Sequence, residues 1–237
     1  MEQLRRLVGA SFIATVGAMA LSTSVGAKNP TTITVEAYGG DIVFDVLRDG
    51  TLVGDHVVTF DDGRDGLVVY SRLSLQIRLL FFTAYSYRYE SRSIWRDGRL
   101  GRLKATVNDD GKKSAVNVTA IANRLSITGP NGEASVHPPI FPTDHGNPGV
   151  LQHSRVLNTI TGSVNAVTIK PIRAEIVETE RGPVAATRYA YTGELETEVL
   201  YDDMGRWVGM AFKGRDGSTI EYVCRRCQGG MASLSAP

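Results

Sequence analysis

This sequence contains few cysteines and has almost no net charge. Only two of its 237 residues are cysteine, and 26 basic residues stand against 25 acidic ones, for a formal net charge of +1. A nucleic-acid-binding domain would show a basic stripe or an isoelectric point above about 9, so we expect no nucleic-acid partner. A chain this long can bury a core without a disulfide framework or a metal. Its content of 42% apolar and 22% charged residues is that of a globular protein.

The sequence motifs of several enzyme classes are also missing. There is no Gly-x-Ser-x-Gly nucleophile elbow, no Gly-x-Gly-x-x-Gly, no P-loop and no His-Glu-x-x-His. Hydrolase, nucleotide-dependent and zinc-protease activities are therefore disfavoured, while chemistry by dispersed residues stays open. We expect no cofactor and no metal, and we favour a protein that is not an enzyme.

The sequence has one long hydrophobic run, which lies at the N-terminus. Arg5 and Arg6 precede an apolar stretch from Leu7 to Leu21, and Val25 and Ala27 stand at the −3 and −1 positions of a small-residue cleavage site. The run is shorter than the roughly 20 residues that a membrane-spanning helix needs. We therefore expect residues 1–27 to be a cleavable signal peptide, the mature chain to lack a transmembrane segment, and the protein to reside in the periplasm or to be secreted.

Turn signals are abundant and evenly spread. Asp-Gly and Asn-Gly pairs tolerate the positive φ of tight hairpins, and runs of alternating polarity lie between them. This pattern predicts a mainly β fold in residues 28–223: a single large curved antiparallel sheet, a half-barrel or open barrel, with one short helix and an irregular crossover on one face. Residues 224–237 form a C-terminal tail. The turn pairs are Asp49-Gly50, Asp62-Gly63, Asp65-Gly66, Asp97-Gly98, Asp110-Gly111, Asn131-Gly132 and Asp216-Gly217.

Two stretches alternate most clearly, and one segment favours a helix. Residues 73–81 predict one strand, and residues 189–201 predict another whose solvent face carries Glu194, Glu196 and Glu198. After the Pro-rich segment 137–142, Asn147 is expected to cap a helix with Pro148 at its first position and its end near 158–162.

The aromatic segment from Tyr85 to Trp95 is the first candidate for a binding surface. As a strand it places Tyr85, Tyr87, Tyr89 and Trp95 on one face. Rings with polar tips suit the wall of an apolar cavity that orients a ligand. The competing interpretation is that these rings are core or an aromatic ladder on the sheet.

Asp144 and His145, followed by Asn147, lie in the predicted crossover. A His and an Asp over a sheet could form a general acid–base pair, with His145 as the catalytic candidate, and His145 and Asn147 join the predicted ligand-binding residues. Addition of His153 gives no recognised metal-ligand spacing. Capping and loop hydrogen bonding is the alternative role for the segment.

Cys224 and Cys227 form a C-x-x-C near the C-terminus. In an oxidising compartment a local disulfide is the expected state. A redox-active pair stays open because Arg225 and Arg226 would lower a thiol pKa, but the motif ends a strand instead of opening a helix.

Several segments together resemble a family of exported proteobacterial proteins known as a domain of unknown function. The resemblance covers about residues 40–223 and departs at Gly146, where the family commonly has an aromatic residue. That family looks distantly similar to the periplasmic lipoprotein-carrier half-barrel, a fold shared with a cofactor-free violacein-pathway enzyme. The resemblance therefore implies a curved sheet with an apolar cavity. It rests on Phe44-Asp45-Val46, Gly54-x-His56, Ala84-Tyr85-x-Tyr87-x-Tyr89, Trp95-Arg96-Asp97-Gly98-Arg99-Leu100, Pro142-Thr143-x-His145-x-Asn147-Pro148, Leu157-Asn158-Thr159, Arg188-Tyr189-x-Tyr191, Tyr201-Asp202, Gly205-Arg206-Trp207-Val208-Gly209 and Asp216-Gly217-Ser218.

Three functions follow from this fold. The first is a periplasmic binding or carrier protein for a lipid or other hydrophobic small molecule. The second is a cofactor-independent enzyme in the same cavity, with His145 as acid–base and Tyr87 or Tyr89 as orienting groups. The third is an envelope structural or assembly protein whose sheet edge docks a partner protein.

Overall fold

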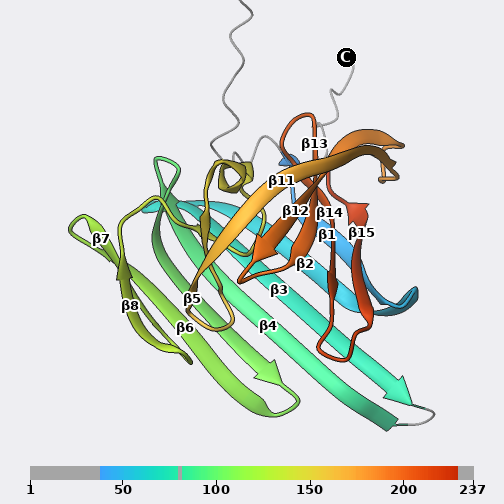
Figure 1. Cartoon of the computed structure of the whole chain (residues 1–237), viewed down its shortest axis with the longest axis horizontal. Helices are drawn as coiled ribbons and strands as arrows, with labels where there is room; N and C mark the ends of the chain where they lie inside the picture. Colours follow the sequence, from blue (N-terminus) through green and yellow to red (C-terminus); the bar gives the residue numbers. More distant parts are fainter. Residues whose placement is uncertain (1–37, 80–81, 229–237) are drawn as a thin grey trace, which may run out of the picture.

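The computed structural model describes residues 38–79 and 82–228 (Figure 1). The predicted signal peptide and the last residues of the predicted tail lie outside these ranges. Fifteen strands form one sheet in the order β8-β7-β6-β5-β4-β3-β2-β1-β15-β14-β13-β12-β11-β10-β9. No helix in the described part of the chain is long and apolar enough to cross a membrane.

The strand bounds are β1 Ile42–Arg48, β2 Thr51–Gly63, β3 Gly66–Leu79, β4 Phe82–Arg96, β5 Arg99–Asp109, β6 Lys112–Ile121, β7 Arg124–Gly129, β8 Gly132–Val136, β9 Phe141–Pro142, β10 Arg155–Leu157, β11 Val164–Val177, β12 Val184–Gly193, β13 Thr197–Asp202, β14 Trp207–Lys213 and β15 Thr219–Arg226. All pairings are antiparallel except that of β9 with β10. The predicted mainly β fold, a single large curved sheet, is confirmed, and the sheet stays open.

Alternating polarity decides which face of each strand points inward. In β5 the buried residues Leu103, Ala105 and Val107 alternate with exposed Lys104 and Thr106. Successive side chains of a strand point to opposite faces, so this alternation turns one face to the core. The turns follow the sequence as well: Asp49, Asp97 and Asp110 have φ near +50° and each precedes a glycine of positive φ.

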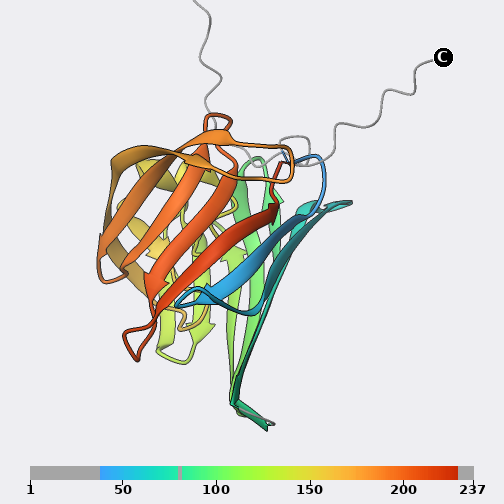
Figure 2. The same ribbon diagram turned by 90° about the vertical axis from the view of Figure 1, so that its right-hand side faces the viewer.

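The curved sheet rolls so that its two halves face each other (Figure 2). The outer strands β8 and β9 do not pair, but loops close the gap between them. Asn131 N donates to Thr161 O over 3.1 Å, and the backbone of Gly129 packs directly on that of Gly162. We call this contact the seam.

The centre of the concave side is packed with side chains. Phe44 and Trp207 lie with ring centroids 4.3 Å apart, and Tyr222 packs 5.9 Å from each. These three rings are buried and belong to one core that spans both halves of the sheet. Aromatic side chains bury large apolar areas, so these three rings contribute to the stability of the core.

The predicted helix is shorter than expected. Asn147 does cap it and Pro148 does open it, but it is a 3-10 helix that ends at Gln152. The prediction that it continues to 158–162 is wrong, because Arg155–Leu157 forms β10 between β9 and β11. Leu157 is buried as predicted, from a strand instead of a helix.

The predicted strand over residues 189–201 is also wrong as a single element. β12 ends at Gly193, whose φ is +116°, and β13 begins at Thr197. Between them the Glu194 carboxylate accepts from Ala166 N over 2.6 Å. The alternation of inward and outward side chains continues in step from β12 through the turn into β13, as it would in one long strand. Local alternation therefore could not separate the two strands. The other predicted strand is confirmed as part of β3, with Leu80 and Phe81 outside the described residues.

The seam gives a stability test. A Cβ at Gly129 would lie 2.8 Å from Thr161 O and 2.9 Å from Gly162 Cα, whereas one at Gly101 would meet only Ile94 O at 3.5 Å. We expect Gly129→Ala to lower the free energy of unfolding by about 1–3 kcal/mol through overpacking. Gly101→Ala, the control, should change it by less than about 0.5 kcal/mol. Urea denaturation measures both, and equal midpoints would contradict the seam contact.

Candidate functional site

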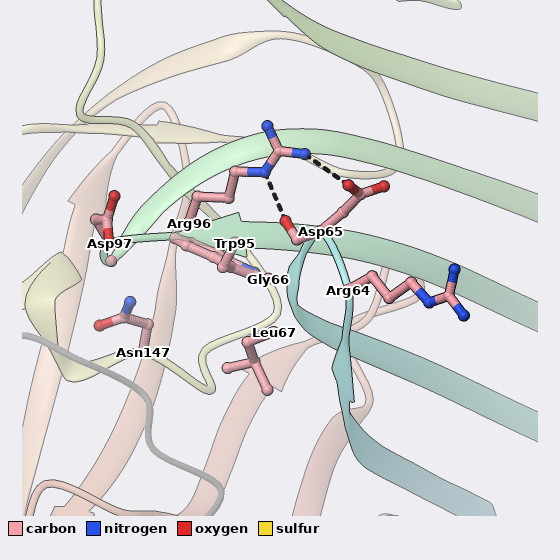
Figure 3. A pocket seen from close by; sticks show the side chains of 9 residues that line it. Arg64, Asp65, Gly66, Leu67, Trp95, Arg96, Asp97 and Asn147 are labelled. Carbon is pink, nitrogen blue, oxygen red and sulfur yellow. Dashed lines mark hydrogen bonds and ion pairs between the residues drawn. The ribbon is translucent and has the colours of Figure 1, made fainter.

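A pocket of about 730 Å³ opens at one rim of the sheet, where two hairpin turns meet the crossover (Figure 3). One turn joins β2 to β3 and the other joins β4 to β5. We call it the rim pocket. Its lining residues are Arg64, Asp65, Gly66, Leu67, Trp95, Arg96, Asp97, Gly98 and Asn147.

Gly66 sets the position of the two turns. Its φ is +117°, and a Cβ there would lie 2.1 Å from the carbonyl oxygen of Trp95. Only glycine allows this close approach. Arg96 then fastens the turns together, because its Nε donates to Asp65 O over 2.5 Å and its guanidinium lies 3.1 Å from the Asp65 carboxylate. This ion pair is largely exposed, so its contribution is mainly geometric.

The floor of the rim pocket is apolar. Trp95 is buried, its Nε1 donates to Ser93 Oγ over 2.9 Å, and its ring lies 6.2 Å from that of Phe141. Leu67, paired with Trp95 across β3 and β4, is half-buried beside it. With its own polar atom satisfied, Trp95 presents hydrocarbon surface to a guest.

Asn147 also lines the rim pocket, and it is only 3% exposed. As the cap of the 3-10 helix, its Oδ1 accepts from Gly149 N over 2.9 Å. Its Nδ2 is buried and has no hydrogen-bond partner in the part of the chain described. A buried donor without a partner costs about 1–3 kcal/mol, so this amide lowers the stability of the crossover.

The rim carries four charged residues. Arg96 pairs with Asp65, whereas the ion pairs found among residues 38–79 and 82–228 include neither Arg64 nor Asp97. Asp97 has φ of +49° and precedes Gly98 in the β4–β5 turn. Its presence follows from turn chemistry, since Asp-Gly suits that conformation. Arg64 is exposed, and no comparable turn requirement explains its presence at this position.

A second polar cluster lies deeper, under the crossover. The His145 ring packs 5.6 Å from that of Tyr191 and 5.9 Å from that of Trp207, and its Nδ1 has no partner among the described residues. Burial lowers the pKa of His145 to about 4. In the same interior, burial lowers the pKa of His56 to about 3, with His145 adding to the effect, and His56 Nε2 lies 2.6 Å from Ser71 Oγ.

Asp144 precedes His145 and is also buried. Burial raises the pKa of its carboxyl to about 7, against the opposing effect of the Gly146 backbone N–H. Within the described ranges no ion pair involves Asp144. Asp144 and His145 therefore both lie in a low-dielectric interior. Neither has a charged partner there that would adjust its pKa for acid–base catalysis.

The predicted site residues separate into two groups. Trp95 and Asn147 meet in the rim pocket, whereas Tyr85, Tyr87, Tyr89 and His145 do not line it. Tyr89 is buried and donates to Thr159 Oγ1 over 2.9 Å, and Tyr85 donates to Asp109 Oδ1 over 2.7 Å. Tyr87 is half-buried, and burial raises its pKa to about 12.

The remaining candidates do not form a metal site. His153 stacks on Phe141 with centroids 4.9 Å apart. Nowhere in residues 38–79 or 82–228 do three His, Cys, Asp or Glu side chains gather as metal ligands. Cys224, in β15, and Cys227 are joined by a disulfide, and the Glu180 carboxylate accepts from the backbone N–H groups of Cys227 and Gln228.

Sequence reasoning missed most of the rim pocket. The sequence predicts no role for Arg64 or Leu67, and Arg96 enters only as part of the family resemblance. The available signal was that the segments Trp95–Gly98 and Asn147–Pro148 both belong to the residues that resemble the family. Their meeting depends on the pairing of Leu67 with Trp95 and on the path of the crossover, which no local pattern encodes.

The buried histidines predict acid sensitivity. Unfolded histidine takes up a proton near pH 6.5, but folded His145 does so only near pH 4, so stability falls as the pH drops through this window. His145→Asn, which tolerates the positive φ at this position, should lose about 1–2 kcal/mol less than the wild type between pH 7 and 5. Urea midpoints at the two pH values measure this, and parallel losses would contradict it.

The raised pKa of Asp144 predicts that stability changes with pH in the opposite direction. Its folded pKa of about 7 lies above its model-peptide value of 3.8, so its stabilising effect is present below that value and lost as the pH rises through about 7. Asp144→Asn keeps an acceptor oxygen and does not titrate. Its stability relative to the wild type should therefore rise from pH 4 to pH 7 in the same urea series, and a constant difference would rule out the raised pKa.

Comparison with known proteins assigns the chain to a family. No curated protein matches the sequence. The structure is similar to the crystal structure of a beta-barrel-like protein of domain of unknown function DUF1849 from Brucella abortus, with a TM-score of 0.57, 11% identity, and coverage of 81% of this chain and 98% of that chain. At this identity the likeness is one of fold. Residues 44–225 match the family described as Domain of unknown function (DUF6134), and the chain belongs to that family.

Proposed function

We propose that this protein is an exported binding protein for a small, partly hydrophobic molecule, which it holds in the rim pocket. The observation that carries the proposal is a pocket that combines the apolar side chains of Trp95 and Leu67 with a charged rim. The pocket volume of about 730 Å³ is within the range of about 300–1,000 Å³ typical of small-molecule sites. Export to the periplasm or outside is supported by the signal-peptide pattern of residues 1–27.

The ligand would therefore bind at the rim of the half-barrel and not at its centre. The sequence-based expectation placed a lipid against Tyr85, Tyr87 and Tyr89. The interior near Tyr89 is packed, and the Tyr89 hydroxyl already has a partner. A lipid or other hydrophobic compound would therefore bind with one end on the floor of the rim pocket and the rest along the open rim.

An enzyme is less favoured than a binding protein. A general base must reach the proton that it removes. The His145 ring is enclosed by Tyr191 and Trp207 and does not line the rim pocket. The segment's hydrogen bonds, in which the His145 and Gly146 carbonyls accept from Tyr201 and Tyr38, support a structural role.

An envelope-assembly role is the second candidate. Within β11, only Val164–Ala166 pair with β10, so the outer edge of β11 beyond Val167 has no neighbouring strand in the described sheet. Ile172 and Ile176 are exposed along it. Such an edge can accept a strand from a partner protein. Lys170, Pro171 and Arg173 on the same stretch are residues that protect edges from pairing, which favours the binding proposal instead.

The binding proposal is tested with three compounds of equal chain length: octanoate, 1-octanol and octylammonium. We expect at least one to bind the wild type by calorimetry, and Leu67→Arg, which fills the pocket, to weaken that binding by at least about tenfold. Leu52→Arg, at an exposed position of β2, is the control and should bind as the wild type does. If none of the three binds and native mass spectrometry finds no small molecule retained by the protein, the binding proposal is wrong.

A further inference from the structure

The end of the hairpin formed by β3 and β4 projects beyond the neighbouring strands (Figures 1 and 2). β2 pairs with β3 only as far as Leu75, and β5 pairs with β4 only from Tyr87 onward. Beyond these residues β3 and β4 pair with each other alone in the described sheet, up to the last pair, Leu79 with Phe82. We call this two-stranded part, residues 76–79 and 82–86, the hairpin end.

We propose that the protein docks on a membrane surface containing anionic lipids, with the hairpin end at the bilayer interface and the cations on the outer face of β3–β6 against the lipid headgroups. The proposal goes beyond the small-molecule binding function. The rim pocket lies at the opposite end of the same two strands, where Gly66 begins β3 and Trp95 lies near the end of β4. A membrane contact and a guest in the rim pocket can therefore be tested separately.

The hairpin end is apolar in sequence. From residue 77 to residue 85 the chain carries one charged residue, Arg78, and no acidic residue. Successive side chains of a strand point to opposite faces, so two strands alone cannot enclose their own apolar side chains, and an isolated hairpin is marginally stable in water. Strand edges that stay in water are usually protected by several charges. A bilayer interface supplies the apolar surroundings that the sheet does not supply here.

The outer face of the adjoining strands is basic. Cross-strand pairing places Arg88 of β4 in line with Asn108 of β5 and Lys113 of β6. In the described part of β3–β6, Glu90 is the one acidic residue among the exposed residues of this face. The whole chain has 26 basic and 25 acidic residues, so the excess belongs to this face and not to the composition. Its exposed cations are Arg72, Arg88, Arg92, Arg102, Lys104 and Lys113.

Most of these cations are available to an anionic partner. Among the ion pairs of residues 38–79 and 82–228, one involves a cation of this face, Arg72 with Asp55 over 4.0 Å. Arg92 donates instead to the Tyr70 hydroxyl over 3.1 Å, and its guanidinium lies 5.6 Å from the centre of that ring. Tyr70 is 41% exposed. An exposed aromatic ring with a polar tip suits the level of lipid headgroups.

The hairpin end and the basic face can reach one bilayer surface together. Arg88 pairs with Ser74, four residues before Arg78 in β3. At about 3.3 Å per residue, the row of Arg88 and Lys113 lies about 13 Å from Arg78 along the strands. With Arg78 among the headgroups, a tilt of the hairpin toward its outer face brings this row within about 10 Å of the surface, where the lipid charge still acts.

A membrane accounts for both features at once. A nucleic acid would engage the basic face but leave the apolar hairpin end in water. A protein partner with an apolar patch would cover the hairpin end but leave the cations without counter-charges. Apolar insertion together with attraction between cations and anionic lipids is the usual basis of peripheral membrane binding.

The charge contribution is tested by flotation of the exported chain, residues 28–237, with lipid vesicles. The vesicles are phosphatidylcholine alone or phosphatidylcholine with an equal part of phosphatidylglycerol. We expect at least about tenfold tighter binding to the mixed vesicles, since each cation near an anionic surface contributes about fivefold. Arg88→Gln should weaken this binding by about fivefold, and added salt should reduce the difference. Lys170→Gln, at an exposed position of β11, is the control and should bind as the wild type does.

The hairpin end is tested by apolar-to-polar changes and by a fluorescent reporter. Leu79→Ser combined with Phe82→Ser should weaken binding to the mixed vesicles by at least about tenfold. Ile176→Ser, at an exposed apolar position of β11, is the matched control. Phe82→Trp should shift its emission to the blue on binding and be quenched by lipids with brominated acyl chains. The native Trp95 and Trp207 are buried, so they should respond little.

Each outcome supports or overturns the membrane assignment. Absence of binding to the mixed vesicles overturns it, as does wild-type binding by the Leu79 and Phe82 double variant. Binding that leaves the Phe82→Trp emission unquenched shows adsorption by charge alone and overturns the role of the hairpin end. If sedimentation shows a dimer that the double variant dissociates, a second copy covers the hairpin end and the membrane assignment is wrong. None of these results bears on the rim pocket, whose test is the binding of the three octyl compounds.

Discussion

The crossover is held on the concave face by two buried tyrosines. Tyr201 donates to the carbonyl of His145 over 2.9 Å, and Tyr38 donates to that of Gly146 over 3.2 Å. The Tyr38 hydroxyl in turn accepts from Trp207 N over 2.8 Å. Asn147 follows directly in sequence, so the depth at which its amide meets the rim pocket depends on these bonds. Buried hydrogen bonds of this kind are expensive to break, which makes the site part of the core's own architecture.

The fold explains why the site lies at a rim. In the interior, large aromatic side chains fill the concave side of the sheet, as Phe44, Trp207 and Tyr222 do on the adjacent strands β1, β14 and β15. Near the hairpin turns the strands end, and the side chains there are charged and not large and apolar. The concave side is therefore not packed at this rim, and a pocket remains. The Brucella protein shares the architecture at a TM-score of 0.57, but at 11% identity it need not share the residues of this pocket.

The sequence predicted those features that are encoded locally. Alternation identified part of β3, the Asp-Gly pairs identified turns, and Asn147-Pro148 identified the start of the 3-10 helix. The length of that helix could not be predicted, because Leu157 is drawn into a strand by partners on β9 and β11. The sequence predicted only part of the rim pocket. Trp95 and Asn147 were predicted as binding residues, but the pairing of Leu67 with Trp95, which brings the two turns together, is tertiary. Tyr85 and Tyr89 look like a binding wall in sequence, yet their hydroxyls are bonded to Asp109 and Thr159.

The strand order also bears on how the chain folds. β1–β8 and β10–β15 are two meanders of neighbouring hairpins, each built from contacts close in sequence. They become one sheet only where β1 meets β15, in pairings such as Phe44 with Cys224, which are 180 residues apart. Closing so long a loop is slow compared with hairpin formation. The first half can therefore form early during synthesis, but the continuous sheet must wait until β15 is available to pair with β1.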